Sequence, residues 1–232
     1  MAYRAPFGID ELYHCYNRGV DKRQIFQDNN DYERFLLLMY IGNCAEPIHI
    51  SNLKNSSLAD AVGNNPISHG DTLVEISAYS LMPNHFHFVL KEIKENGIST
   101  FMQKVFTAYT MYFNKKNNRS GTLFAGPFKS KHVADDEYLK HLISYMHLNA
   151  AELFEPQWKQ GVANTAQLEK QLLNYRFSSL PDFLNNKRLE RKILGDSIFT
   201  YFDSIPTIID IIEEAKAYYI EISRRGLDEN CD

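Results

Sequence analysis

Cysteine is scarce in this sequence, and the few cysteines do not form a recognisable pattern. Only three occur among 232 residues, Cys15, Cys44 and Cys231, and no two have CxxC spacing. An odd and scattered set argues against a disulfide framework. The expected location is therefore a reducing cytoplasm.

Long apolar runs are absent as well. No run approaches the ~20 residues that a membrane span requires, the first ten residues lack the apolar core of a signal peptide, and no internal repeat is visible. The 44% hydrophobic content, with 14 Tyr and 15 Phe, is enough for a buried core and argues against disorder. We expect one domain, or one domain with an appendage, and no membrane partner.

Acidic residues are missing from one stretch of a chain whose net charge is -4. Residues 96–134 contain no Asp or Glu and six basic residues, which are Lys104, Lys115, Lys116, Arg119, Lys129 and Lys131. Residues 181–232, in contrast, carry 11 acidic and 7 basic residues. The asymmetry is consistent with a nucleic-acid contact, but a basic run on its own is more often an ordinary solvated surface.

Residue periodicity predicts the order of the main elements. Strands are expected at residues 12–17, 73–80, 85–91 and 128–133, and helices at 31–41, 99–116 and 135–152. The order is strand, helix, strand, strand, helix, strand, helix. This order predicts an α+β fold: a ferredoxin-like antiparallel sheet (βαββαβ) with one further helix.

Two other regions have a different character. Residues 52–71 are rich in Ser, Asn and Gly and are expected to form a surface loop or insertion. Residues 182–194 and 208–224 are expected as the two helices of a C-terminal appendage. The predicted division is a catalytic domain at 1–182 and a helical extension of unknown role at 183–232.

His85-Phe86-His87 lies on the third expected strand. Because side chains alternate along a strand, His85 and His87 point to the same face and Phe86 points into the core. Two imidazoles so placed can converge on one metal ion. Two ligands do not make a site, however, and the pair is also consistent with histidines that bind water or a backbone carbonyl.

Tyr145 and Asn149 are four residues apart on the last helix of the expected domain and therefore share one face. Tyr145 offers a phenol that can act as a nucleophile, and Asn149 offers a carbonyl oxygen as a hard ligand. Taken alone, the pair is better explained by ordinary structure, since tyrosine is common in cores and asparagine is common at helix ends.

Taken together, these motifs resemble those of the HUH superfamily of tyrosine transposases that act on single-stranded DNA, and most of all the REP-associated tyrosine transposases. The resemblance covers residues 11–182. It is carried by YHCYNRG at 13–19, LMPNHFH at 81–87, YFN at 112–114, GTLF at 121–124, FKS at 128–130, YMHLN at 145–149, YRFSS at 175–179 and PD at 181–182. Relatives have proline after the asparagine, whereas this chain has Ala150.

The resemblance implies a function and a set of site residues. It implies cleavage and rejoining of single-stranded DNA beside a hairpin through a 5′-phosphotyrosine, without a nucleotide cofactor, by a monomer or a homodimer. Tyr145 is then the nucleophile. His85, His87 and Asn149 are then ligands of Mg²⁺ or Mn²⁺.

The basic stretch gains a use in this context. Its six basic residues are expected to contact phosphates, Tyr112 to stack on an unpaired base, and Arg18 to contact the phosphate at the end of the first strand. His14, His132, His141 and His147 are expected as structural residues or nucleic-acid contacts. Three alternatives stay open: a DNA-binding protein without activity, a metal hydrolase that uses water, and an interaction domain.

Overall fold

The computed structural model describes residues 6–46, 48, 50, 56–63, 71–159, 161–184, 188–202, 207–212 and 214–215. Parts of the expected loop (52–55 and 64–70), of the last expected helix (213 and 216–224) and Cys231 lie outside the described residues. None of the described helices is both long and apolar enough to cross a membrane.

Four strands form one sheet at the centre of the molecule. They are β1 (Leu12–Arg18), β2 (Val74–Met82), β3 (His85–Glu92) and β4 (Lys129–His132). The strand order is β2-β3-β1-β4, and every neighbouring pair is antiparallel. With its helices this is the βαββαβ arrangement of a ferredoxin-like fold, so the predicted fold class is confirmed.

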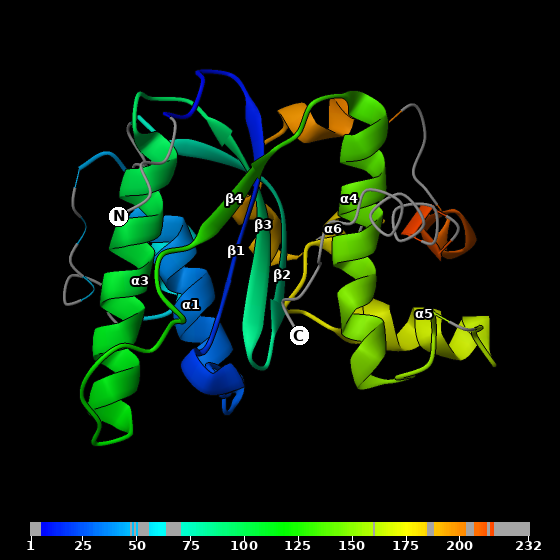
Figure 1. The fold of residues 1–232 in the computed structure, drawn as a ribbon, viewed down its shortest axis with the longest axis horizontal. Helices are drawn as coiled ribbons and strands as arrows, with labels where there is room; N and C mark the ends of the chain where they lie inside the picture. The colour runs from blue at the N-terminus through cyan, green and yellow to red at the C-terminus, as the bar shows by residue number, and fades with distance from the viewer. Residues whose placement is uncertain are drawn as a thin grey trace.

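Two long helices, α1 (Asn29–Gly42) and α3 (Gly97–Lys116), cover one face of the sheet (Figure 1). The side chain of Asp28 caps α1 by accepting a hydrogen bond from the backbone of Asp31. At the start of α3, the buried carboxylate of Glu92 accepts hydrogen bonds from the backbone N–H groups of Gly97 (3.0 Å) and Ile98 (2.7 Å). The end of β3 therefore fixes where α3 begins.

The aromatic residues of β3 decide which face of the sheet is the core. Phe86 packs on Phe35 of α1, with 5.7 Å between ring centroids, and Phe88 lies 6.2 Å from Phe101 of α3. Because side chains alternate along the strand, His85 and His87 point to the opposite face.

That opposite face is covered by α4 (Asp136–Leu148), which stands beside the sheet in Figure 1. The helix was expected to run to residue 152, but it changes at Asn149 into a 3-10 helix, η3 (Asn149–Leu153). The following helix, α5 (Thr165–Asn174), was not predicted. A short 3-10 turn, η1 (Val20–Lys22), follows β1.

The expected loop at 52–71 contains a short helix, α2 (Leu58–Val62). The side chain of Ser57 accepts a hydrogen bond from the backbone of Asp60, and the carboxylate of Asp60 accepts one from the backbone of Ser57. This capping box stabilises the first turn of α2, although the polar composition of the segment predicts a loop.

The expected helix at 182–194 is wrong. The chain instead forms α6 (Leu180–Phe183), η4 (Leu189–Ile193) and η5 (Ser197–Tyr201). Arg188 is extended and its guanidinium binds the carboxylate of Asp182. In a continuous helix these two residues, six apart, would lie on different sides. Residues 208–212 and 214–215 are helical, as expected for the second tail helix.

Candidate active site

The two histidines of β3 lie side by side on the face of the sheet that α4 covers. His85 is 7% exposed and His87 2%, and their ring centroids are 5.2 Å apart. The strand therefore presents both imidazoles to one small region between the sheet and α4.

Tyr145 reaches the same region from α4. Its ring centroid is 6.1 Å from that of His87, and the residue is only 6% exposed. Asn149 caps α4 with helical backbone angles, so it keeps the one-turn spacing from Tyr145. The structure thus brings His85, His87 and Tyr145 together, with Asn149 one turn along the helix.

Burial keeps the imidazoles of His87 and His14 neutral. Burial, and after it the neighbouring His14 and His85, hold the pKa of His87 well below its usual value. Burial, with a smaller effect of Lys131, also lowers the pKa of His14 to about 3. A neutral imidazole retains the lone pair that a metal or a proton donor needs.

Buried polar atoms without a hydrogen-bond partner among the described residues include Nε2 of His87 and Nδ2 of Asn149. Buried polar atoms are normally paired, so an unpaired one marks a place for a ligand. Rotation of the Asn149 amide would place its carbonyl oxygen where Nδ2 now lies. Two imidazoles and an amide oxygen suit a divalent cation that also binds phosphate and water.

The described part of the chain contains no group of three or more His, Cys, Asp or Glu side chains arranged to hold a metal. A site made of His85, His87 and Asn149 has only two members of that set. It would leave several coordination positions for substrate oxygens, which is usual for Mg²⁺ or Mn²⁺ beside a phosphate.

Three neighbours of the histidines were not predicted as site residues. His14 on β1 lies 2.8 Å from His87 (Nε2 to Nδ1), and Oδ1 of Asn84 lies 2.7 Å from Nδ1 of His85. The ring of Tyr16 stacks on both His14 and His87, at centroid distances of 4.8 and 5.7 Å. Alternation along β1 places His14 and Tyr16 on one face, but only the register with β3 shows that this is the histidine face.

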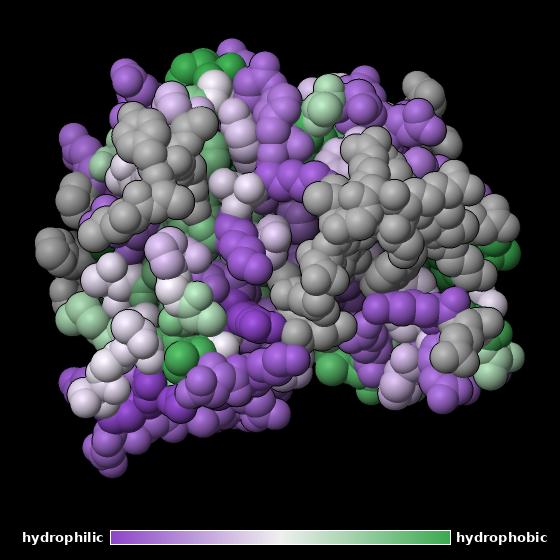
Figure 2. Space-filling view, viewed as in Figure 1, coloured by the Kyte–Doolittle hydropathy of each residue, from purple (hydrophilic) through white to green (hydrophobic). Residues whose placement is uncertain are grey.

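Three of the residues expected to contact DNA lie on the histidine face. Arg18 is the cross-strand partner of His85, and Lys129 and Lys131 are the partners of Tyr16 and His14. Directly paired residues on neighbouring strands point the same way. Figure 2 shows hydrophilic residues over β4, in the middle of this view.

The other expected DNA contacts lie on α3 or just after it. Lys104 donates to the carbonyl of Cys44, and Lys116 is paired with Asp28 and Asp31. These groups belong to the helix layer on the far side of the sheet from Tyr145. The hydroxyl of Tyr112 donates a hydrogen bond to Asp31. Arg119 donates to Asn114 and to the carbonyl of Thr122. Lys115 is exposed in the last turn of α3.

Comparison with known proteins finds a similarity to transposases. Residues 69–149 match the family described as IS200-like transposases, and the matched range extends from just before β2 to Asn149. The matched range is called the IS200-like segment. The IS200-like segment contains every residue of the candidate metal site and Tyr145, and transposases are enzymes that act on DNA.

Among solved structures, the chain is similar to a REP-associated tyrosine transposase bound to a REP hairpin. The two chains are 12% identical, the similarity covers 89% of this chain and 99% of the other, and the TM-score is 0.49. No curated protein sequence matches this chain.

Proposed function

We propose that this IS200-like chain is a metal-dependent tyrosine transposase of the REP-associated branch, which cleaves and rejoins single-stranded DNA beside a hairpin. Tyr145 is the nucleophile, and His85, His87 and Asn149 hold Mg²⁺ or Mn²⁺. The proposal assigns catalysis to the domain at 1–182 and gives no role to the extension at 183–232.

One observation carries this proposal: a phenol from α4 and the two imidazoles of β3 meet in a buried region that also contains unpaired polar atoms. Tyr145 and His87 are 58 positions apart in the chain, and nothing in ordinary core packing requires a tyrosine, two histidines and an amide at one place. Perturbed titratable groups gathered in this way are typical of active sites.

In the chemical step, the Oη atom of Tyr145 attacks the phosphorus of the scissile phosphodiester. A bond forms between Oη and phosphorus, and the bond between phosphorus and O3′ breaks, with its electron pair passing to O3′. The phenol proton leaves to solvent, and O3′ takes up a proton to become a free hydroxyl. The reverse attack by a 3′ hydroxyl releases Tyr145 and rejoins the strand, so no nucleotide cofactor is needed.

When bound, a divalent cation would polarise a non-bridging oxygen of the phosphate and offset the charge that develops during attack. The residues of the chain supply the rest. His85 and His87 are held on a rigid strand, whereas Tyr145 and Asn149 are held one helical turn apart on α4. Tyr145 is 6% exposed, so the nucleophile is held in a largely buried position.

The proposed DNA path begins at the open edge of the sheet. Lys129 lies over the ring of Tyr16 and Lys131 over the ring of Tyr138, at 5.8 and 4.7 Å from the ring centroids. Cations for phosphates beside aromatic faces for bases are what unpaired nucleic acid requires. Arg18 would contact the phosphate nearest the histidines.

The test uses single-stranded hairpin oligonucleotides incubated with the full chain and Mn²⁺. The label lies in the fragment that would begin with the 5′ phosphate after cleavage, because that fragment would become linked to Tyr145. We expect wild-type protein to acquire the label covalently, as seen on a denaturing gel. Tyr145→Phe should abolish the adduct, because the ring remains and only the nucleophilic oxygen is lost. Tyr138→Phe, two turns earlier on α4, is the matched control and should retain it.

The alternatives give different results. Cleavage without an adduct that persists in Tyr145→Phe and disappears in His85→Ala would indicate a hydrolase that uses water. Salt-sensitive DNA binding without cleavage by any variant would indicate a binding protein. An interaction domain would bind neither DNA nor metal.

A further inference from the structure

The ring of His87 uses its two nitrogens differently. Nδ1 lies 2.8 Å from Nε2 of His14 in a fully buried contact, whereas Nε2 is buried without a hydrogen-bond partner among the described residues. The two rings are nearly parallel, with an interplanar angle of 17°. A contact of this length between two nitrogens is a hydrogen bond, so one nitrogen must carry a proton and the other a lone pair.

Two arrangements of the protons satisfy that bond. In one, Nδ1 of His87 donates to His14, and the Nε2 atom of His87 keeps its lone pair. In the other, His14 donates to His87, and the Nε2 atom of His87 carries a buried proton for which the described part of the chain offers no acceptor. The second arrangement leaves an unsatisfied buried donor, which costs free energy. The first leaves a lone pair directed at the candidate site.

The neighbouring histidine provides an internal comparison. Nδ1 of His85 lies 2.7 Å from Oδ1 of Asn84, and a carbonyl oxygen can only accept. His85 in its neutral form therefore carries its proton on Nδ1 and its lone pair on Nε2. Each histidine of β3 thus has a dedicated partner at the same ring position.

We propose that His14 is a positioning residue of the active site: it accepts the Nδ1–H of His87 and so leaves Nε2 of His87 as the nitrogen that faces the site. Asn84 does the same for His85. Histidines that bind metals usually donate their second ring N–H to a fixed acceptor, which sets both tautomer and ring orientation. The tautomer follows from the contacts alone, whereas the use of Nε2 as a metal ligand rests on the proposed function.

The surroundings of His14 suit this role. Its ring is 5% exposed and stacks on Tyr16 at 4.8 Å, which restricts rotation. A neutral imidazole has one ring nitrogen with a lone pair, and Nε2 is the nitrogen of His14 that faces His87. His14 comes from β1 and His87 from β3, so the contact also depends on the register of the two strands.

Two variants separate the acceptor from the ring. His14→Phe keeps an aromatic ring in the stack with Tyr16 and removes the acceptor. His14→Gln restores a carbonyl oxygen that can accept from Nδ1 of His87. His132→Phe, an exposed histidine on the same sheet, is the matched control.

The first measurement is the ¹⁵N NMR spectrum of the histidine rings in the metal-free full chain. We expect a protonated Nδ1 and an unprotonated Nε2 for His87 in wild type and in His14→Gln, and loss of this single tautomer in His14→Phe. A proton on Nε2 of His87 in wild-type protein would overturn the proposal, whether or not the phenylalanine variant folds.

The second measurement is Mn²⁺ binding by calorimetry without DNA. His14→Phe should weaken the affinity ~10–100-fold, the range usual for loss of such a partner, and His14→Gln should restore most of it. Equal affinity in His14→Phe and wild type would exclude the positioning role while leaving the proposed function intact. A third outcome is also informative: wild-type protein could show the expected tautomer of His87 and yet bind no Mn²⁺ and form no DNA adduct. That outcome would refute the proposed function, but His14 would still orient His87.

Discussion

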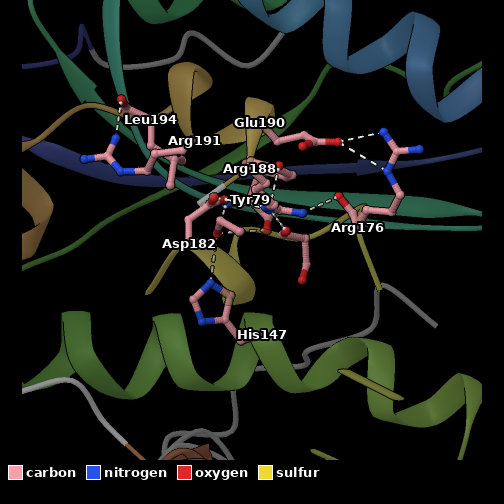
Figure 3. A network of polar contacts seen from close by, with 10 residues as sticks. Tyr79, His147, Arg176, Asp182, Arg188, Glu190, Arg191 and Leu194 are labelled. Atoms are coloured by element: carbon pink, nitrogen blue, oxygen red, sulfur yellow. Dashed lines mark hydrogen bonds and ion pairs between the residues drawn. The ribbon is translucent and has the colours of Figure 1, made fainter. Parts of the chain in front are cut away.

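Arg188 is the most heavily bonded side chain in the polar network of Figure 3. Its guanidinium donates to both carboxylate oxygens of Asp182, to the hydroxyl of Tyr79 and to the carbonyls of Ser178 and Arg176. The Asp182 side chain is 0% exposed. Burial raises the pKa of Asp182 even though Arg188 lowers it, so this carboxylate depends on its partner.

We predict that Arg188→Ala lowers the free energy of unfolding by about 3–5 kcal/mol, because it leaves a buried charge without compensation. Urea denaturation measures the loss. Arg191→Ala is the matched control: Arg191 pairs with Asp196, whose side chain is 92% exposed, donates to the carbonyl of Leu194 and lies over the ring of Phe199, so its removal leaves no buried charge and should lower stability less. Equal losses in the two variants would contradict the assignment of Arg188 as a buried anchor.

Individual residues of the candidate site were predictable where local spacing places them. Alternation gives the common face of His85 and His87, and helical spacing gives that of Tyr145 and Asn149. The roles of His14 and Asn84 were not predictable. His14 meets His87 only through the pairing of β1 with β3, and sequence spacing carries no information about register between strands 73 residues apart.

The basic residues separate by element into two groups. Lys129 and Lys131 lie on β4, on the histidine face, whereas Lys116 on α3 is held by the carboxylates of Asp28 and Asp31. We predict that Lys129→Ala and Lys131→Ala each weaken single-stranded DNA binding and each reduce the salt dependence by about one counterion. Fluorescence anisotropy titrations at several salt concentrations measure both effects.

Lys116→Ala serves as the comparison of equal charge change. It should leave the salt dependence of DNA binding unchanged and should instead lower stability, because Asp31 is buried and loses a partner. A salt slope reduced equally in all three variants would place the DNA path on α3 as well as on β4.

At the level of elements, those that pack both sides of the sheet were predicted within a few residues, because each has a strong alternating or helical pattern. The shorter elements were not. The length of α6 and the extended backbone at Arg188 are set by the bonds of Arg188 to distant groups, and α2 depends on a two-residue capping box inside a polar segment. Tertiary contacts and capping, rather than periodicity, decide these elements.

The molecule as a whole joins α4 to the sheet through residues far apart in the chain. His147, two residues after Tyr145, lies 2.8 Å from the hydroxyl of Ser179 (Nε2 to Oγ), and Ser179 accepts from the backbone N–H of Tyr79 on β2. The segment at 177–179 also pairs with β2 through its backbone. Chain beyond the IS200-like segment therefore helps to hold the tyrosine helix in place, which no local pattern indicates.

This junction makes stability depend on pH. Burial, with a smaller effect of Arg188, lowers the pKa of His147 to about 3, against about 6.5 in an unfolded chain. Between these values the unfolded state binds more protons than the folded state. The stabilising contribution of neutral His147 is therefore complete above about pH 6.5 and is lost as the pH falls, at about 1.4 kcal/mol per pH unit.

His147→Gln isolates this effect, because glutamine can bond to Ser179 without titrating. We predict that, when the pH falls from 7 to 5, the wild type loses about 2 kcal/mol more free energy of unfolding than His147→Gln does. Urea denaturation at both pH values measures this loss. Ser179→Ala removes the bond but keeps the histidine, so its curve should run parallel to that of wild type. If the difference in free energy of unfolding between wild type and His147→Gln stayed constant over this range, His147 would titrate alike in the folded and unfolded states. In that case α4 would not be held against the sheet by a neutral buried imidazole.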